Sequence, residues 1–175
     1  MSFTDKMEKD KVDNKKFANT GMYFKFLEGA NQFRIITEPE VYYNDFKKGI
    51  CYEDCGFKGS PKYMCYILDR ADGGIKLANL PFTIAEELGT LERDEDYTFE
   101  GFPMPYDLKV EAKNAGTKEV DYKTLAKGRA ELNEEELKKW EDFKVNEKFK
   151  TAQTIIEEKK AENKSKAGFE GSDTE

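Results

Sequence analysis

A tight β-hairpin between residues 62 and 80 is the sequence feature that most constrains how this chain can fold. Residues 62–69 (KYMCYILD) form a run rich in aromatic and branched side chains, and residues 75–80 (IKLANL) form a second apolar run. Asp72, Gly73 and Gly74 lie between them. Asp-Gly and Gly-Gly pairs supply the positive φ angles that a hairpin turn needs. The sequence therefore predicts two antiparallel strands here.

Further runs of aromatic and β-branched residues flank this hairpin and have the pattern of short strands. They are residues 22–27, 31–37, 41–46, 97–102, 106–112 and 120–125. Residues 81–88 predict a short helix that ends before Gly89, and the glycine-containing residues 47–60 predict a loop. The expected fold is mainly β with added helices, built as a five-stranded OB-type antiparallel barrel with a short internal helix.

The last quarter of the chain has the pattern of a long, charged C-terminal helix over residues 131–163. Asn133 and Glu136 predict a capping box, and Leu132 and Leu137 a hydrophobic staple. So long a helix exceeds what a small barrel can cover, so we expect its first half to pack and its second half to project or fray. This gives four parts: a flexible arm over 1–20, a binding domain over 21–130, the helix, and an acidic disordered tail over 164–175.

Charge and residue usage narrow the function classes. The net charge is −7, but residues 1–60 contain 10 Lys and Arg against 10 Asp and Glu, so this third can still form a basic groove. The chain has no histidine, which removes the usual general base and the commonest zinc ligand. We therefore expect no enzyme; a Mg²⁺-dependent nuclease built from surface carboxylates is the weak alternative.

The three cysteines predict reduced thiols in a cytosol, where disulfides are rare. Cys51, Cys55 and Cys65 could form a zinc site only with a carboxylate such as Glu53 or Asp54. Free thiols are the favoured interpretation, with no metal and no cofactor. No run approaches the roughly 18 apolar residues of a membrane span.

Aromatic and cationic side chains alternate along the predicted strands, as a single-stranded nucleic-acid groove requires. Aromatic rings also fill β cores, which is the favoured reading for Phe24, Phe26, Phe33 and Phe99. Tyrosine is different, because its hydroxyl resists burial without a partner. The candidate strand-binding residues are Tyr23, Lys25, Arg34, Tyr42, Tyr43, Lys62, Tyr63, Tyr66, Arg70, Lys76, Tyr122 and Lys123.

The order of these segments resembles phage-encoded single-stranded DNA-binding proteins of OB fold. FKFLEGANQFRIITEP (24–39) is similar to the opening of that family, and KYMCYILDR (62–70) with GIKLANLP (74–81) to its central hairpin. Residues 82–91 match its short helix, and YDLKV (106–110) with VDYKTL (120–125) its closing strands. The likeness covers residues 22–130. The chain departs from it at Tyr42 and Tyr43, where relatives often have tryptophan.

The resemblance implies sequence-tolerant binding of exposed single strands during phage DNA replication or recombination, in the host cytoplasm and without catalysis. The acidic tail is expected either to dock replication or recombination proteins or to compete with DNA for the groove. The alternative is a non-catalytic interaction module whose barrel and long helix dock protein partners.

Overall fold

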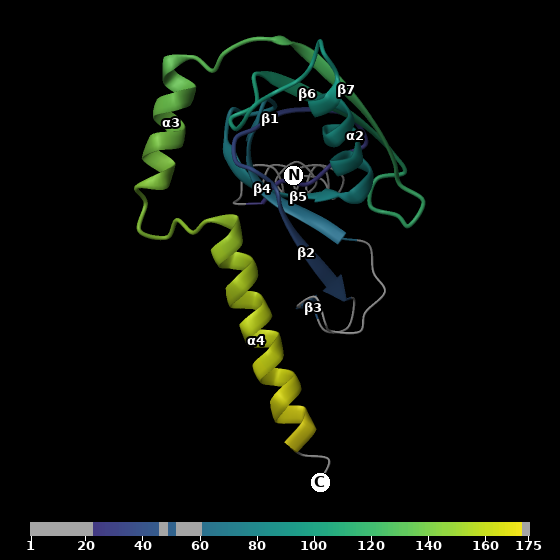
Figure 1. Ribbon diagram of the computed structural model, residues 1–175, viewed down its shortest axis with the longest axis vertical. Coiled ribbons are helices and arrows are strands. Elements are labelled where there is room, and N and C mark those ends of the chain that lie inside the picture. The colour runs from purple at the N-terminus through teal and green to yellow at the C-terminus, as the bar shows by residue number, and fades with distance from the viewer. Residues whose placement is uncertain (1–22, 46–48, 52–60, 173–175) are drawn as a thin grey trace, which may run out of the picture.

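The computed structural model describes residues 23–45, 49–51 and 61–172, and the side chains of 23–43 and 61–162. The strands are β1 (Gly29–Ile35), β2 (Glu40–Asp45), β3 (Gly49–Cys51), β4 (Pro61–Asp69), β5 (Ile75–Pro81), β6 (Tyr106–Lys113) and β7 (Asp121–Arg129). The helices are α2 (Phe82–Arg93), α3 (Glu134–Lys144) and α4 (Ala152–Ser172). The expected class, mainly β with added helices, is confirmed (Figure 1).

One seven-stranded sheet contains all the strands. Six follow the order β3-β2-β4-β1-β6-β7, and β5 pairs with β4 outside this path. The predicted hairpin is confirmed: β4 and β5 pair antiparallel from Lys62–Pro81 to Leu68–Ile75, and Gly73 at the turn has a φ of +73°. Since β5 occupies one edge of β4, both β1 and β2 pair with its other edge.

The sheet is open. Among the residues that the structure describes, β7 pairs with β6 alone, so the predicted closed barrel is not confirmed. Residues 23–27, predicted as a strand, make only one bridge, from Tyr23 to Leu77. The side chain of Asn31 bonds Leu27 at both its backbone N–H and its carbonyl, which holds this segment in a turn ahead of β1.

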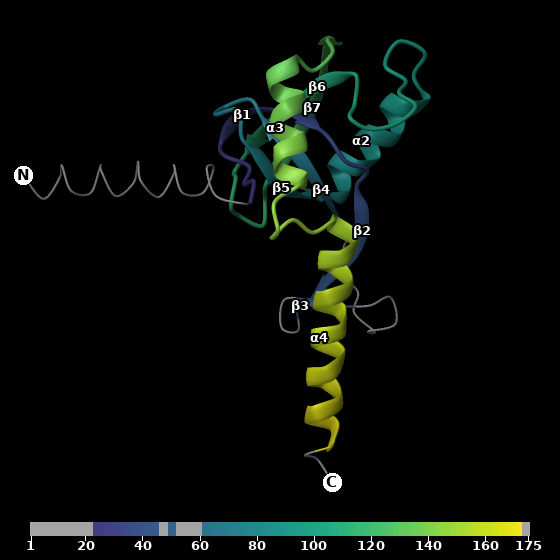
Figure 2. The same ribbon diagram turned by 90° about the vertical axis from the view of Figure 1, so that its left-hand side faces the viewer.

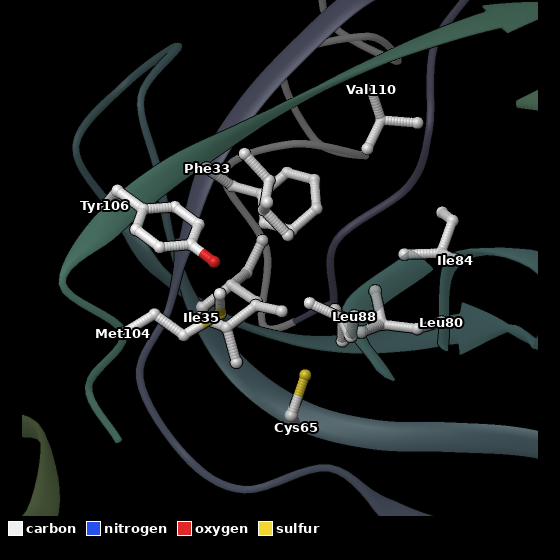
Figure 3. Close-up of a cluster of buried hydrophobic side chains, with 12 residues drawn as sticks. Phe33, Ile35, Cys65, Leu80, Ile84, Leu88, Met104, Tyr106 and Val110 are labelled. Atoms are coloured by element: carbon white, nitrogen blue, oxygen red, sulfur yellow. The ribbon is translucent and has the colours of Figure 1, made fainter. Parts of the chain in front are cut away.

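The first core lies on the inner face of the sheet, under α2. Ile84 and Leu88, one helical turn apart, are its buried residues on α2, and Figure 3 shows them against strand residues such as Phe33 and Cys65. Leu91 also packs on this core, so α2 runs through Gly89 to Arg93 instead of ending at residue 88. Residues 97–102, predicted as a strand, form no strand: Tyr97 ends a turn, and residues 100–102 form a bend.

The second core lies on the outer face, where α3 and α4 cover β4 and β5. Met64, Tyr66 and Leu68 from β4 meet Trp140 of α3 and Ile156 of α4. β4 is therefore buried on both faces, which explains its continuous apolar run. Figure 2 shows α3 lying across the sheet, while the far turns of α4 project away from it.

The single predicted helix over 131–163 is two helices in the structure. The predicted capping box of Asn133 and Glu136 is present at the start of α3. Residues 145–151, here called the elbow, separate α3 from α4, because the Asn146 side chain accepts a hydrogen bond from the Lys148 backbone N–H (2.9 Å) and forms a local turn. Helix α4 extends to Ser172 and so runs into residues 164–175, for which the sequence predicts an acidic disordered tail. The predicted arm over residues 1–20 lies outside the described residues.

Candidate nucleic-acid interface

An aromatic pocket opens between the elbow and the outer face of the β4–β5 hairpin. Its volume is about 290 Å³. Tyr66 comes from β4, Phe143 from α3 and Phe149 from the elbow, while Tyr23 closes it from the segment that precedes β1. The full lining is Tyr23, Tyr66, Phe143, Asn146, Lys148, Phe149, Lys150, Ile155 and Glu158.

Tyr66 fixes the floor of this aromatic pocket. Its ring centroid lies 5.4 Å from Phe143 and 5.3 Å from Phe149, within the range of favourable aromatic pairs. Its hydroxyl donates a 2.5 Å hydrogen bond to the Lys150 carbonyl. Burial, and then the nearby Tyr23, raises the pKa of the Tyr66 phenol, so the floor stays uncharged at neutral pH. The rings are therefore held in place before any ligand arrives.

The rim of the aromatic pocket offers one exposed ring and one lysine without an ion-pair partner among the described side chains. Tyr23 is 51% exposed, so one ring is free to stack on a ligand. Lys150 pairs with Glu158 at 2.7 Å, whereas Lys148 has no ion-pair partner among the described side chains. A flat apolar group can thus enter between rings while an anion approaches Lys148.

A second pocket, the hairpin pocket, lies beside the turn of the β4–β5 hairpin. It has a volume of about 330 Å³, and Phe24, Arg70 and Lys109 are among the residues that line it. Tyr23 lines the aromatic pocket and the next residue, Phe24, lines the hairpin pocket. Lys25 is exposed and lines neither of these two pockets.

Comparisons of this chain with protein-family models, with curated proteins and with solved structures find no match. The assignment of function therefore depends on the site itself.

Four of the predicted strand-binding residues are buried, which corrects their assignment. Arg34 is 2% exposed, Lys76 1%, Tyr42 4% and Tyr66 3%. Tyr42 is part of the second core, and burial raises its pKa to about 12. Tyr66 lines the aromatic pocket, as its floor. A buried side chain cannot stack on a strand or follow its backbone.

The buried cations among these residues neutralise buried carboxylates. Arg34 Nε lies 2.7 Å from Asp107, and Lys76 Nζ lies 2.7 Å from Asp69 and 2.8 Å from Asp72. Arg70, which is half-buried, bonds both Asp107 and Glu136. These pairs hold strands and α3 together, so their cations are not available to phosphates.

The remaining candidates lie in two other places. Tyr43, Lys62 and Tyr63 belong to the β2–β4 ladder, where Tyr42 opposes Lys62 and Val41 opposes Tyr63. Tyr122 and Lys123 belong to β7; Tyr122 packs against the first core, and burial raises its pKa. The structure does not gather these residues with Tyr23 into one groove.

Sequence reasoning missed Phe143, Lys148 and Phe149, because all three were placed on one continuous helix. The available signal was Asn146, a residue that favours turns and sits between two aromatic residues. A break there turns Phe149 back toward Tyr66.

The structure describes the side chain of one of the three cysteines, Cys65. Cys65 is fully buried and free, and burial raises the pKa of its thiol. The side chains of Cys51 and Cys55 lie outside the described residues. Within the described ones, no three His, Cys, Asp or Glu residues come together as a metal site would require, and no helix is long and apolar enough to cross a membrane.

Proposed function

We propose that this protein is a sequence-tolerant, non-catalytic single-stranded DNA-binding protein that protects exposed strands in phage DNA replication or recombination. The observation that carries this proposal is the aromatic pocket, where exposed Tyr23 and the ordered ring of Phe149 lie beside Lys148. Stacking on aromatic rings accepts every base, and each stacked base contributes roughly 1–3 kcal/mol.

The order of the elements supports an OB-type barrel as the finer description of the fold. Strands β1 and β2 together would be its first strand, β4 and β5 its second and third, and β6 and β7 its last two. The β1–β6 pairing and the position of α2 between β5 and β6 agree with that order. OB folds bind oligonucleotides on the face of the second and third strands; here α3 and α4 cover much of that face, and the aromatic pocket opens beside them with Tyr66 as its floor.

The alternative, a protein-interaction module, is favoured by the projecting turns of α4 (Figure 1). In this alternative, the barrel and the long helix dock protein partners instead of a DNA strand.

Fluorescence anisotropy with labelled oligo-dT tests the main proposal. The oligonucleotide should be about thirty nucleotides long, beyond the roughly 4–16 that one OB fold contacts. We expect the protein to bind it and to leave a duplex of equal length unbound. Each phosphate contact should steepen the log–log dependence of the binding constant on salt by about 0.7. Absence of binding at low salt would refute the proposal.

Replacing Tyr23 by alanine should weaken oligo-dT binding about tenfold, within the range of one lost stacking contact. Tyr23 is half exposed, so the loss should come without unfolding. Tyr97→Ala is the matched control, because Tyr97 is 37% exposed and lies outside both pockets. Equal affinities of the two variants would show that the aromatic pocket is not the binding site.

A further inference from the structure

A third cavity borders α3 at Trp140 and has the opposite charge. Its volume is about 770 Å³. Its aromatic wall consists of Phe99, Phe102 and Trp140, and its acidic residues are Glu38, Glu92 and Glu100. We call it the acidic cavity.

The wall of the acidic cavity is ordered by ring packing. Phe99 and Phe102 lie 5.6 Å apart in an edge-to-face pair, and Phe99 also contacts Tyr106 at 6.5 Å. Trp140 is held from the other side by Phe143, whose ring stacks on it at 6.0 Å. The cavity therefore has a fixed apolar surface and does not depend on its carboxylates for shape.

The charge of the cavity is uncompensated. Glu38, Glu92 and Glu100 are exposed, and no lysine or arginine lines the cavity. Among the described side chains, none of the three makes an ion pair. A phosphate backbone would be repelled here, so the ligand of this cavity is not the DNA strand.

We propose that the acidic cavity binds a basic side chain, arginine or lysine, from a protein partner. Such a side chain has an apolar stem that packs on rings and a cationic head that stays polar. The stem would lie on Phe99 and Phe102, and the head would reach the carboxylates, where an aromatic face also attracts a cation. The apolar stem thus matches the aromatic wall, and the cationic head matches the carboxylates.

This site is independent of the proposed DNA-binding function. Trp140 lines the acidic cavity and Phe143 lines the aromatic pocket, and the two rings stack on each other, so the two sites share no lining residue but meet at this ring pair. A strand and a basic protein segment can therefore be bound at the same time, each by the side of complementary charge.

Trp140 is the sole tryptophan of the chain, so its fluorescence reports on this cavity. We expect a short acetylated oligo-arginine peptide to change that fluorescence in a saturable way. The variant Glu38→Gln/Glu92→Gln/Glu100→Gln should weaken the binding about tenfold, since it removes all three exposed ion pairs that the bound cation could form. The substituted residues are exposed, and circular dichroism checks that the variant is folded.

The control variant Glu119→Gln/Glu131→Gln/Glu157→Gln loses the same net charge at exposed sites outside the cavity, and should bind as the unaltered protein does. Equal weakening in both variants would mean attraction by net charge alone and would overturn the proposal. Unchanged binding in the cavity variant would overturn it as well. Tighter binding of spermidine than of the peptide would replace the protein partner by a polyamine.

Discussion

Replacing Trp140 by alanine is expected to lower the free energy of unfolding by about 3–5 kcal/mol, the range for a buried tryptophan reduced to alanine. Trp140 is the buried residue of α3 and joins the helix to the second core. Its ring lies 5.8 Å from Tyr66 and 5.9 Å from Phe149. Removal would leave a hole between α3, the elbow and β4. Urea unfolding followed by far-UV circular dichroism measures the change without requiring the lost indole.

Val145→Ala is the control for this variant. Val145 directly follows α3 and is 78% exposed, so its truncation should change the free energy of unfolding by about 0.5 kcal/mol or less. If Trp140→Ala costs no more than Val145→Ala, α3 does not pack on the sheet as described.

Replacing Asp107 by asparagine should destabilise the protein by about 3–5 kcal/mol, because breaking a buried pair leaves an uncompensated charge. Asp107 accepts hydrogen bonds from Arg34, Gln32 and Arg70 at 2.7, 3.0 and 2.8 Å. Arg70 also bonds Glu136, so this cluster joins β1, β6, the hairpin and α3. Asp121→Asn is the control, since Asp121 is exposed on β7. A loss as small as that of Asp121→Asn would contradict this account of the cluster.

The same carboxylate should make stability depend on pH. Burial acts to raise the pKa of Asp107, but hydrogen bonds from Arg70, Gln32 and Arg34 outweigh it and hold the pKa below its usual value. A carboxyl whose pKa is lowered by folding stabilises the protein above its unfolded pKa of about 3.9 and loses this contribution as the pH falls through the folded pKa. Urea unfolding between neutral and acidic pH should therefore show a smaller acid loss for Asp107→Asn than for the unaltered protein.

The hairpin and the start of α3 could be predicted from the sequence because local chemistry specifies them. Asp72 and Gly73 dictate the turn, and the side chains of Asn133 and Glu136 close the first turn of α3 themselves. Residues 97–102 could not be predicted in this way. Their aromatic pattern is that of a strand, but the rings pack edge to face around Tyr106 instead of lining a ladder.

The candidate site was harder to predict because the burial of a strand residue depends on the helices that cover its face of the sheet. The alternation in β4 indicates which residues share a face, but not that α3 and α4 cover the outer one. Tyr66 therefore looked like an exposed stacking platform, whereas it forms the floor of a pocket. Arg34 and Lys76 have the pattern of groove cations for the same reason. The partner of Arg34, Asp107, is distant in sequence, and the partner of Lys76, Asp69, is buried within the hairpin.

The projecting part of α4 sets the C-terminal end of the described chain apart from the sheet (Figure 2). Between Ile156, the last buried residue among the described side chains of α4, and Ser172 the helix rises about 24 Å at 1.5 Å per residue. A group attached near Ser172 would stand at that distance from the second core and remain clear of the pockets.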